Sequence, residues 1–264
     1  MSQFKVPYWH GRHPFPPDKK EPMVITRDKI VRFLLYGKTT YTDMNWLYAS
    51  TDKIHVGIYS IPPRGRFDPP DIHEGDEVYY MLEGTLSILN PESGSVHEVL
   101  PGEGLLIPTR CWHQGHNFGK EPVTGIWAIA PLMWDLEKGP PTEYKPLDRK
   151  PIPEMTVINH SNVKRMILGK DHRIPVAIYT QTSMLSFGTF EVPLNEYSEA
   201  QVHQGDTVVL PLKGKLIVYL PMDDRTFEIR DDGEAFIIPQ GVKHQYYNFT
   251  KDIVKAVFFV APKL

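Results

Sequence analysis

The chain has 264 residues and a net charge of −3 without a basic stripe, which excludes nucleic acid as an expected partner because phosphate binding depends on clustered Lys and Arg. No apolar run approaches ~20 residues, so no membrane-spanning segment is expected. No secretory signal is evident, and Cys111 is the only cysteine, so no internal disulfide can form. These features predict a cytoplasmic protein.

The first segment, residues 1–22, combines prolines with aromatic residues. It has too many prolines for a helix and too many aromatic side chains for plain disorder. We expect an N-terminal arm that packs across the other domain of the chain or a partner subunit.

A first spaced motif follows within residues 65–84. Its members are Gly65, Asp71, His73, Glu77 and Gly84. Alternate side chains of a strand share one face, so Asp71 and His73 point the same way, and Glu77 rejoins that face after a short turn. This spacing predicts three polar groups on one interior surface.

A second spaced motif brings in a fourth polar group. Its members are Gly102, Pro108, His113 and Asn117. We predict a mononuclear metal site formed by Asp71, His73, Glu77 and His113. The alternative is that these groups only hydrogen-bond one another, although buried carboxylates need partners and a metal is a common one.

The chain repeats itself after a shift of about 131 residues, which indicates a tandem duplication. Gly102, Pro108, His113 and Asn117 fall on Gly233, Pro239, His244 and Asn248. At the ligand positions the second copy has Gln201, His203, Thr207 and His244. Two neutral imidazoles without a carboxylate bind a divalent ion poorly, so this degenerate site is expected to be metal-free. It could be purely structural or hold a second ligand.

Composition predicts an all-β fold with two domains. The 25 prolines and 19 glycines punctuate many short apolar-alternating segments. We expect a first, metal-binding domain over residues 23–131, an extended Pro-rich linker over 132–154 and a second domain over 155–264. Helix is expected only in short pieces, around residues 28–35 and 162–168.

The two motifs resemble the signature motifs of the cupin superfamily, and the duplication resembles its two-domain members. The resemblance implies two tandem antiparallel β-barrels of the double-stranded β-helix, jelly-roll-like type. It also implies a divalent metal, usually on three His and one Glu. This chain departs from the family pattern with Asp71 at the first His position and Arg110 at a usual Gly.

The Asp71 departure leaves two ligand sets open. If Asp71 binds the metal, two carboxylates and two imidazoles neutralise its charge and weaken it as a Lewis acid. If Asp71 stands back, His73, Glu77 and His113 form the two-His, one-carboxylate set typical of non-haem Fe(II) oxygenases.

Residues near the predicted metal site suggest a substrate pocket. Strand parity places Tyr79 and Met81 on the Glu77 face, and Trp127 and Ile129 are candidates on a later strand. These side chains would give an apolar, partly aromatic wall. Arg64 and Arg110 could clamp a carboxylate or enolate at the mouth.

Three functions follow, in order of preference. The first is a non-haem Fe(II) dioxygenase that cleaves a small chelating enol, phenol or oxo-acid, as many two-domain cupins do. The second is a non-oxidative isomerase, lyase or cyclase, in which the metal polarises a carbonyl and Asp71 or Glu77 is the base. Fe(II) is the favoured metal, and Mn(II), Zn(II) and Ni(II) are alternatives. The third is a non-catalytic ligand-binding protein. A small-molecule substrate and a homodimer are expected, because strand edges need cover.

Overall fold

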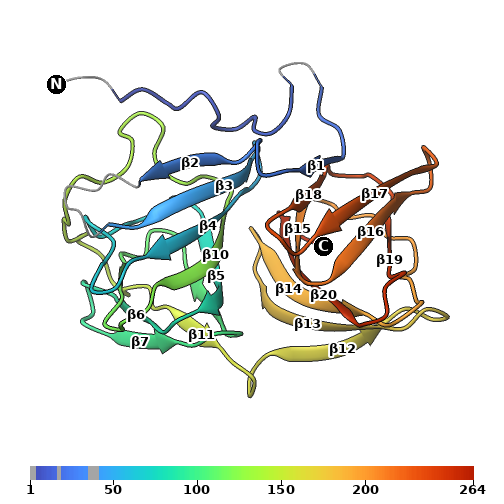
Figure 1. Ribbon diagram of the computed structural model, residues 1–264. Helices are drawn as coiled ribbons and strands as arrows, with labels where there is room; N and C mark the ends of the chain where they lie inside the picture. Colours follow the sequence, from blue (N-terminus) through green and yellow to red (C-terminus); the bar gives the residue numbers. More distant parts are fainter. Residues whose placement is uncertain (1–3, 17–18, 35–41) are drawn as a thin grey trace. The chain divides into compact units, whose positions relative to one another are not determined.

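The computed structural model describes residues 4–16, 19–34 and 42–264, and every regular element in them is a β-strand (Figure 1). No helix capable of spanning a membrane occurs in this part of the chain. The chain divides into a first unit, residues 1–11 and 31–162, and a second unit, residues 12–30 and 163–264. The all-β prediction is confirmed.

The first unit consists of a seven-stranded and a three-stranded antiparallel sheet. The large sheet runs in the order β11 (Thr156–Ile158), β8 (Gly104–Ile107), β5 (Asp76–Glu83), β10 (Val123–Ala130), β4 (His55–Ile61), β3 (Met44–Ser50) and β2 (Val31–Leu34). The small sheet contains β7 (Val96–Val99), β6 (Leu86–Leu89) and β9 (Gln114–His116). Buried residues of both sheets form one core cluster, so the unit is a two-sheet sandwich, not a barrel closed by hydrogen bonds.

The second unit repeats this arrangement strand for strand. Its large sheet runs β1 (Met23–Ile25), β18 (Ala235–Ile238), β15 (Asp206–Lys213), β20 (Val254–Ala261), β14 (Ser186–Val192), β13 (Ile174–Gln181) and β12 (Lys164–Leu168). Its small sheet contains β17 (Arg225–Arg230), β16 (Lys215–Leu220) and β19 (Gln245–Tyr247). Equal strand order in both units is what a duplicated sequence predicts.

The first strand of each sequence repeat joins the unit that is formed mainly by the other repeat. Strand β1 pairs antiparallel with β18 of the second unit, and β11 pairs antiparallel with β8 of the first. Residues 23–30 therefore lie outside the first domain to which the sequence assigned them, and residues 155–162 lie outside the second. Sequence spacing identifies a strand but not the sheet edge that it joins, and each added strand covers an edge that would otherwise be open.

The expected linker, residues 132–154, folds onto the first unit. Met133 and Trp134 are buried in that unit's core. The Asn90 side-chain amide donates to the Pro153 carbonyl at 2.9 Å, and Arg149 pairs with Glu92 at 2.8 Å. The segment thus forms part of the wall of the unit and does not act as a free spacer.

The two short helices expected around residues 28–35 and 162–168 are wrong where the structure describes them. Val31–Leu34 and Lys164–Leu168 are edge strands, paired with β3 and β13 respectively. Residue 35 lies outside the described residues. A short apolar run fits both the helical period and the strand period, and pairing with a neighbouring strand decides which structure forms.

A buried histidine predicts how stability depends on pH. His55 is fully buried, with Nδ1 2.8 Å from Ser50 Oγ and Nε2 3.2 Å from the Pro131 carbonyl. Burial, with a smaller effect of His10, lowers the pKa of His55 to about 3. The unfolded chain takes up this proton below its usual pKa of about 6.5 while the folded chain does not, so stability is lost as pH falls from 6.5 towards 3.

We expect the free energy of unfolding to drop by about 2–3 kcal/mol between pH 7 and pH 4.5 on account of His55 alone. Urea unfolding of the wild type and of His55→Gln at the two pH values measures this. The variant should lose less stability over the interval, and an identical loss in both proteins would contradict the assignment.

Candidate metal centre

Two loops of the first unit are locked together by an isolated β-bridge. The Asp71 amide donates to the His113 carbonyl at 2.8 Å, and the His113 amide donates to the Asp71 carbonyl at 3.0 Å. The two sequence motifs, which lie far apart in the chain, therefore meet in fixed register.

The turn before β5 places Glu77 next to this bridge. A Cβ on Gly75 would lie 2.2 Å from the Ala130 carbonyl oxygen, so only glycine fits this close approach. Asp76 Oδ1 accepts the Thr109 amide at 2.9 Å, which ties the turn to the loop that carries His113. Glu77 then enters β5 as its second residue, facing the core.

The motif asparagine is a clamp and not a ligand. The Asn117 side-chain amide donates to three backbone carbonyls, those of Ile61, Pro62 and Glu121, at 2.8–3.1 Å. Asn248 makes the equivalent contacts in the second unit. This position therefore holds the loop that leads into the site and explains why it recurs in both repeats.

The four predicted ligands converge in the first unit, and all are buried. Glu77 Oε2 lies 3.2 Å from His73 Nε2 and 3.2 Å from His113 Nε2. Asp71 Oδ2 lies 3.6 Å from His73 Nε2, and its other oxygen accepts the Ile72 amide at 2.8 Å. Donor atoms of Asp71, His73 and His113 all lie within 4.8 Å of one another. Asp71 therefore does not stand back from the cluster.

Backbone contacts orient both imidazoles towards the cluster. His73 Nδ1 lies 2.7 Å from the Met133 carbonyl and His113 Nδ1 lies 3.0 Å from the Cys111 carbonyl. A carbonyl only accepts, so each Nδ1 carries the hydrogen and leaves Nε2 available as a ligand, the usual arrangement of metal-binding histidines. Consistent with this, Glu77 Oε2 and His113 Nε2 are buried without a hydrogen-bond partner among the described residues.

The geometry fits a single divalent cation. Nitrogen and oxygen ligands about 2.0–2.2 Å from one metal lie about 3.0–3.5 Å apart. The separations between Glu77 and the two imidazoles, 3.2 Å each, fall in this interval. We take the donor set, Asp71, His73, Glu77 and His113, as compatible with a divalent metal.

The negative charges of the two carboxylates favour a cation at the centre of the cluster. Burial alone would lower the pKa of His73, but the carboxylates of Asp71 and Glu77 outweigh burial and raise it to about 10. Burial would raise the pKa of Glu77, but the positive charge of His73 and contacts with both imidazoles lower it to about 2. A divalent metal would replace the proton that otherwise balances these carboxylates.

A cavity of about 30 Å³ adjoins the cluster. Of the side chains predicted to line a pocket, Tyr79, Trp127 and Ile129 do so. Met81 is buried in the core, where it accepts the Tyr59 hydroxyl at 3.2 Å. The walls therefore combine apolar and aromatic side chains with the ligand candidates.

The two arginines predicted at the mouth do not line this cavity. Arg110 is exposed and pairs with Glu74 at 2.9 Å, and Arg64 is exposed in a turn with a φ of 63°. Both precede a motif residue in sequence, but a solvated turn points their side chains away from the core.

Several lining residues were missed from the sequence: Phe33, Asp43, Asn45, Tyr59, Phe67 and Met133. Phe33, Asn45 and Tyr59 lie on β2, β3 and β4, and Asp43 directly precedes β3, so these four are outside both motifs. Asp43 matters most, because it is a buried carboxylate beside the ligands. The only signal in the sequence was an acidic residue directly before an apolar strand, which is too common to be diagnostic.

In the second unit the equivalent positions also come together, with a different bonding pattern. Gln201 and His244 form the corresponding bridge, and the His203 and His244 rings lie 4.9 Å apart. Thr207, at the position of Glu77, lies with Oγ1 2.8 Å from His203 Nδ1. Within the described residues, the metal-compatible cluster is that of the first unit. That the second site is metal-free stays a prediction.

Comparisons with known proteins agree with this fold. Residues 57–129, which span the first-unit cluster, match the family model described as Cupin domain. No curated protein matches the chain.

Solved structures with a similar fold span most of the chain. A glyoxylate-induced protein from Pseudomonas aeruginosa is 16% identical, with a TM-score of 0.67 over 97% of this chain and 96% of its own. AerE from Microcystis aeruginosa is 11% identical, with a TM-score of 0.65 over 88% of this chain and 97% of its own. A Bacillus subtilis oxalate decarboxylase variant is 13% identical, with a TM-score of 0.65 over 93% of this chain and 80% of its own. At these identities the likeness establishes the cupin fold alone.

Proposed function

We propose that the first unit is a metal-dependent enzyme that performs acid–base chemistry on a small carbonyl compound, as an isomerase, lyase or cyclase. The observation that carries this proposal is the Asp43 carboxyl group. It lines the same cavity as Asp71, His73 and Glu77 but is not one of the clustered ligand residues. The site therefore offers a proton-transfer group in addition to its ligands, which Asp71 and Glu77 could not supply while they hold a metal.

A short hydrogen-bond chain fixes Asp43. The Trp127 indole N–H donates to Asn45 Oδ1 at 3.0 Å, and the Asn45 amide donates to Asp43 Oδ2 at 2.6 Å. Because an indole nitrogen only donates, Trp127 sets the orientation of the Asn45 amide. Asp43 is thus held in one position at the cavity wall, as a general acid or base must be.

The environment of Asp43 also suits proton transfer near neutral pH. Burial raises the pKa of Asp43 to about 7, against the opposing effect of the Asn45 hydrogen bond. Both protonation states are then accessible at physiological pH, the condition in which a general acid–base group works best.

The cavity favours a substrate of only a few non-hydrogen atoms. It has a volume of about 30 Å³ and, among the described residues, no Lys or Arg lines it. A bound divalent metal would supply charge stabilisation at a carbonyl or carboxylate oxygen. Tyr59, Phe67 and Trp127 are buried lining residues and would limit the access of water to the cavity.

A non-haem Fe(II) dioxygenase is the second candidate. The two imidazoles and Glu77 provide the two-His, one-carboxylate set that such enzymes use. Asp71 weighs against it, because its carboxylate lies within the cluster and would occupy a further position on the metal.

One experiment separates the two candidates. The protein is loaded in turn with Fe(II), Mn(II), Zn(II) and Ni(II) and offered small oxo-acids, enols and phenols in D2O, with oxygen uptake and NMR followed together. Oxo-acids are included because two fold neighbours are described by oxalate and glyoxylate. Metal-dependent exchange or rearrangement of carbon-bound hydrogen without oxygen uptake supports acid–base chemistry. Stoichiometric oxygen uptake with Fe(II) supports the dioxygenase, and neither response with any compound defeats both.

A further inference from the structure

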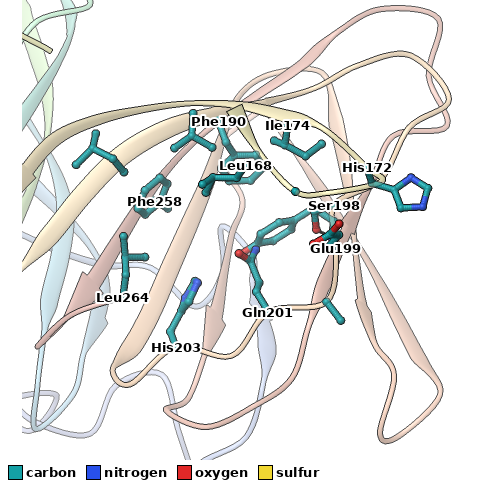
Figure 2. Close-up of a pocket in the computed structure, with 15 residues that line it drawn as sticks. Leu168, His172, Ile174, Phe190, Ser198, Glu199, Gln201, His203, Phe258 and Leu264 are labelled. Atoms are coloured by element: carbon teal, nitrogen blue, oxygen red, sulfur yellow. Dashed lines mark hydrogen bonds between the residues drawn. The ribbon is translucent and has the colours of Figure 1, made fainter. Parts of the chain in front are cut away.

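A cavity of about 200 Å³ lies within the second unit. Figure 2 shows the side chains that line it. Its apolar wall comes from the large sheet: Ile174, Val176 and Ile178 of β13, Phe190 of β14 and Phe258 of β20. A cavity of about 150 Å³ holds benzene, so this one accommodates a molecule of about one ring.

One corner of this cavity is polar. Gln201 and His203 line this corner, as Figure 2 shows. The buried Tyr246 also lines the cavity. The His244 ring lies 4.9 Å from that of His203 and 5.3 Å from that of Tyr246. Two of the degenerate ligand positions of the second repeat, Gln201 and His203, therefore form part of the wall of a cavity.

Two polar atoms at this corner have no partner among the described residues. They are the hydroxyl of Tyr246, which lines the cavity, and Nε2 of His244, which lies behind the lining residues; both side chains are buried. His244 Nδ1 donates to the Val242 carbonyl at 3.0 Å, so Nε2 is a free acceptor. Tyr246 can donate or accept. Buried polar groups are normally satisfied, so this corner is built to receive a hydrogen-bonding group.

The corner does not suit an ion. Burial lowers the pKa of His203 to about 3 and that of His244 to about 4, so both rings are neutral. No Lys or Arg is among the described lining residues, and the one carboxylate, Glu199, accepts backbone amides of Lys170 and Asp171 at 2.5 and 2.9 Å. An anion would find no counter-charge. A divalent cation would find no carboxylate at the position of Glu77, where Thr207 stands.

We propose that the second unit binds a small, uncharged, hydroxyl-bearing organic molecule of about one ring, such as a phenol. The ring lies against the Ile174, Phe190 and Phe258 wall, and the hydroxyl bonds to the Tyr246 hydroxyl at the polar corner. This site is independent of the activity proposed for the first unit and needs no metal.

Binding of three probes to the full-length protein tests the proposal. The probes are 4-methylphenol, toluene and 4-methylbenzoate, followed through isotope-labelled isoleucine methyl groups by NMR, because Ile174 and Ile178 line the cavity. We expect saturable shifts of these methyl signals with 4-methylphenol. Toluene, which lacks the hydroxyl, should bind about tenfold more weakly, and 4-methylbenzoate should not bind.

Two variants and a control sharpen the test. Tyr246→Phe should reduce affinity for 4-methylphenol about tenfold and leave that for toluene unchanged, because only the hydroxyl is removed. Val176→Phe places a ring in the cavity and should abolish binding of both. The control, Tyr219→Phe, removes an exposed hydroxyl that bonds Asp224 outside the cavity and should bind like the wild type. Melting curves show whether each variant is folded.

Several outcomes overturn the proposal. Equal affinity for 4-methylphenol and toluene would show that the polar corner does not contribute to binding. A folded Tyr246→Phe variant that binds both compounds as the wild type does would show the same. Zn(II) or Mn(II) that shifts the same methyl signals and displaces 4-methylphenol makes the pocket a metal site. Binding of none of the probes leaves the cavity structural.

Discussion

Replacing Glu77 with glutamine should remove metal binding from the first unit. The change keeps the shape of the side chain but deletes the charge that lies 3.2 Å from both imidazole Nε2 atoms. A divalent ion loses one of its two carboxylates, and the buried amide cannot replace it. We expect affinity for the metal to fall at least about 100-fold, since loss of even an outer-shell partner costs 10–100-fold.

Metal analysis of proteins purified without added ions, followed by titration of the metal-free forms, measures this effect. Metal should raise the melting temperature of the wild type but not that of Glu77→Gln, because only a folded state with an intact site gains from binding. The matched control is Glu74→Gln, three residues earlier in the same turn. Glu74 is partly exposed and pairs with the exposed Arg110, so its loss should change metal content little.

Two results would refute the proposed centre. The first is a Glu77→Gln variant that retains metal with the affinity of the wild type. The second is a wild-type protein that takes up none of Fe(II), Mn(II), Zn(II) and Ni(II), because the cluster would then be an internal hydrogen-bond network only.

The second large effect is expected for Asp43→Asn, which should lower turnover without loss of metal. If Asp43 transfers a proton, the variant loses about 10²–10⁴-fold in kcat, the usual contribution of general acid–base catalysis. The amide keeps the size of the side chain and can still bond to Asn45, so the cavity should keep its shape. Metal content should equal that of the wild type, because Asp43 is not one of the clustered ligands.

Turnover with the substrate found in the metal screen, together with metal analysis of the same samples, checks this prediction. The pH profile adds a second readout, because an ionisation near pH 7 in the wild type should be missing from the residual activity of Asp43→Asn. Asp52→Asn, which changes an exposed aspartate of the same unit, is the control. Unchanged kcat in Asp43→Asn would assign the proton transfer to another group, and lost metal would make Asp43 a ligand.

Sequence spacing predicted which ligand candidates come together, because their placement is mostly local. Asp71, His73 and Glu77 lie within seven consecutive residues, and a short turn decides which way each side chain points. The repeat located His113 as the counterpart of His244. The structure brings all four ligand candidates of the first copy together, as the motifs predict. The structure does not place Asp71 away from the cluster, as the alternative three-ligand set required.

The positions of side chains that depend on contacts with distant parts of the chain could not be predicted from sequence spacing. Asp43 reaches the cavity because β3 pairs with β4, and β4 with β10, so that Trp127 can orient Asn45 and through it Asp43. Arg110 precedes His113 directly, yet its backbone has a φ of 57° and its side chain leaves the interior. Neighbours in sequence can thus face opposite ways, and residues far apart can share one wall.

By itself, the sequence determined the all-β class, the duplication and the residue types of the candidate metal centre, because periodicity, turn residues and motif spacing act over a few residues. The tertiary structure alone decided that β1 and β11 each join the unit of the other repeat, and that residues 132–154 pack on the first unit. It also decided that the second repeat, having lost its carboxylate, encloses the larger cavity. Those outcomes depend on which sheet edges pair and how side-chain volumes fill the space between sheets, and these are non-local properties.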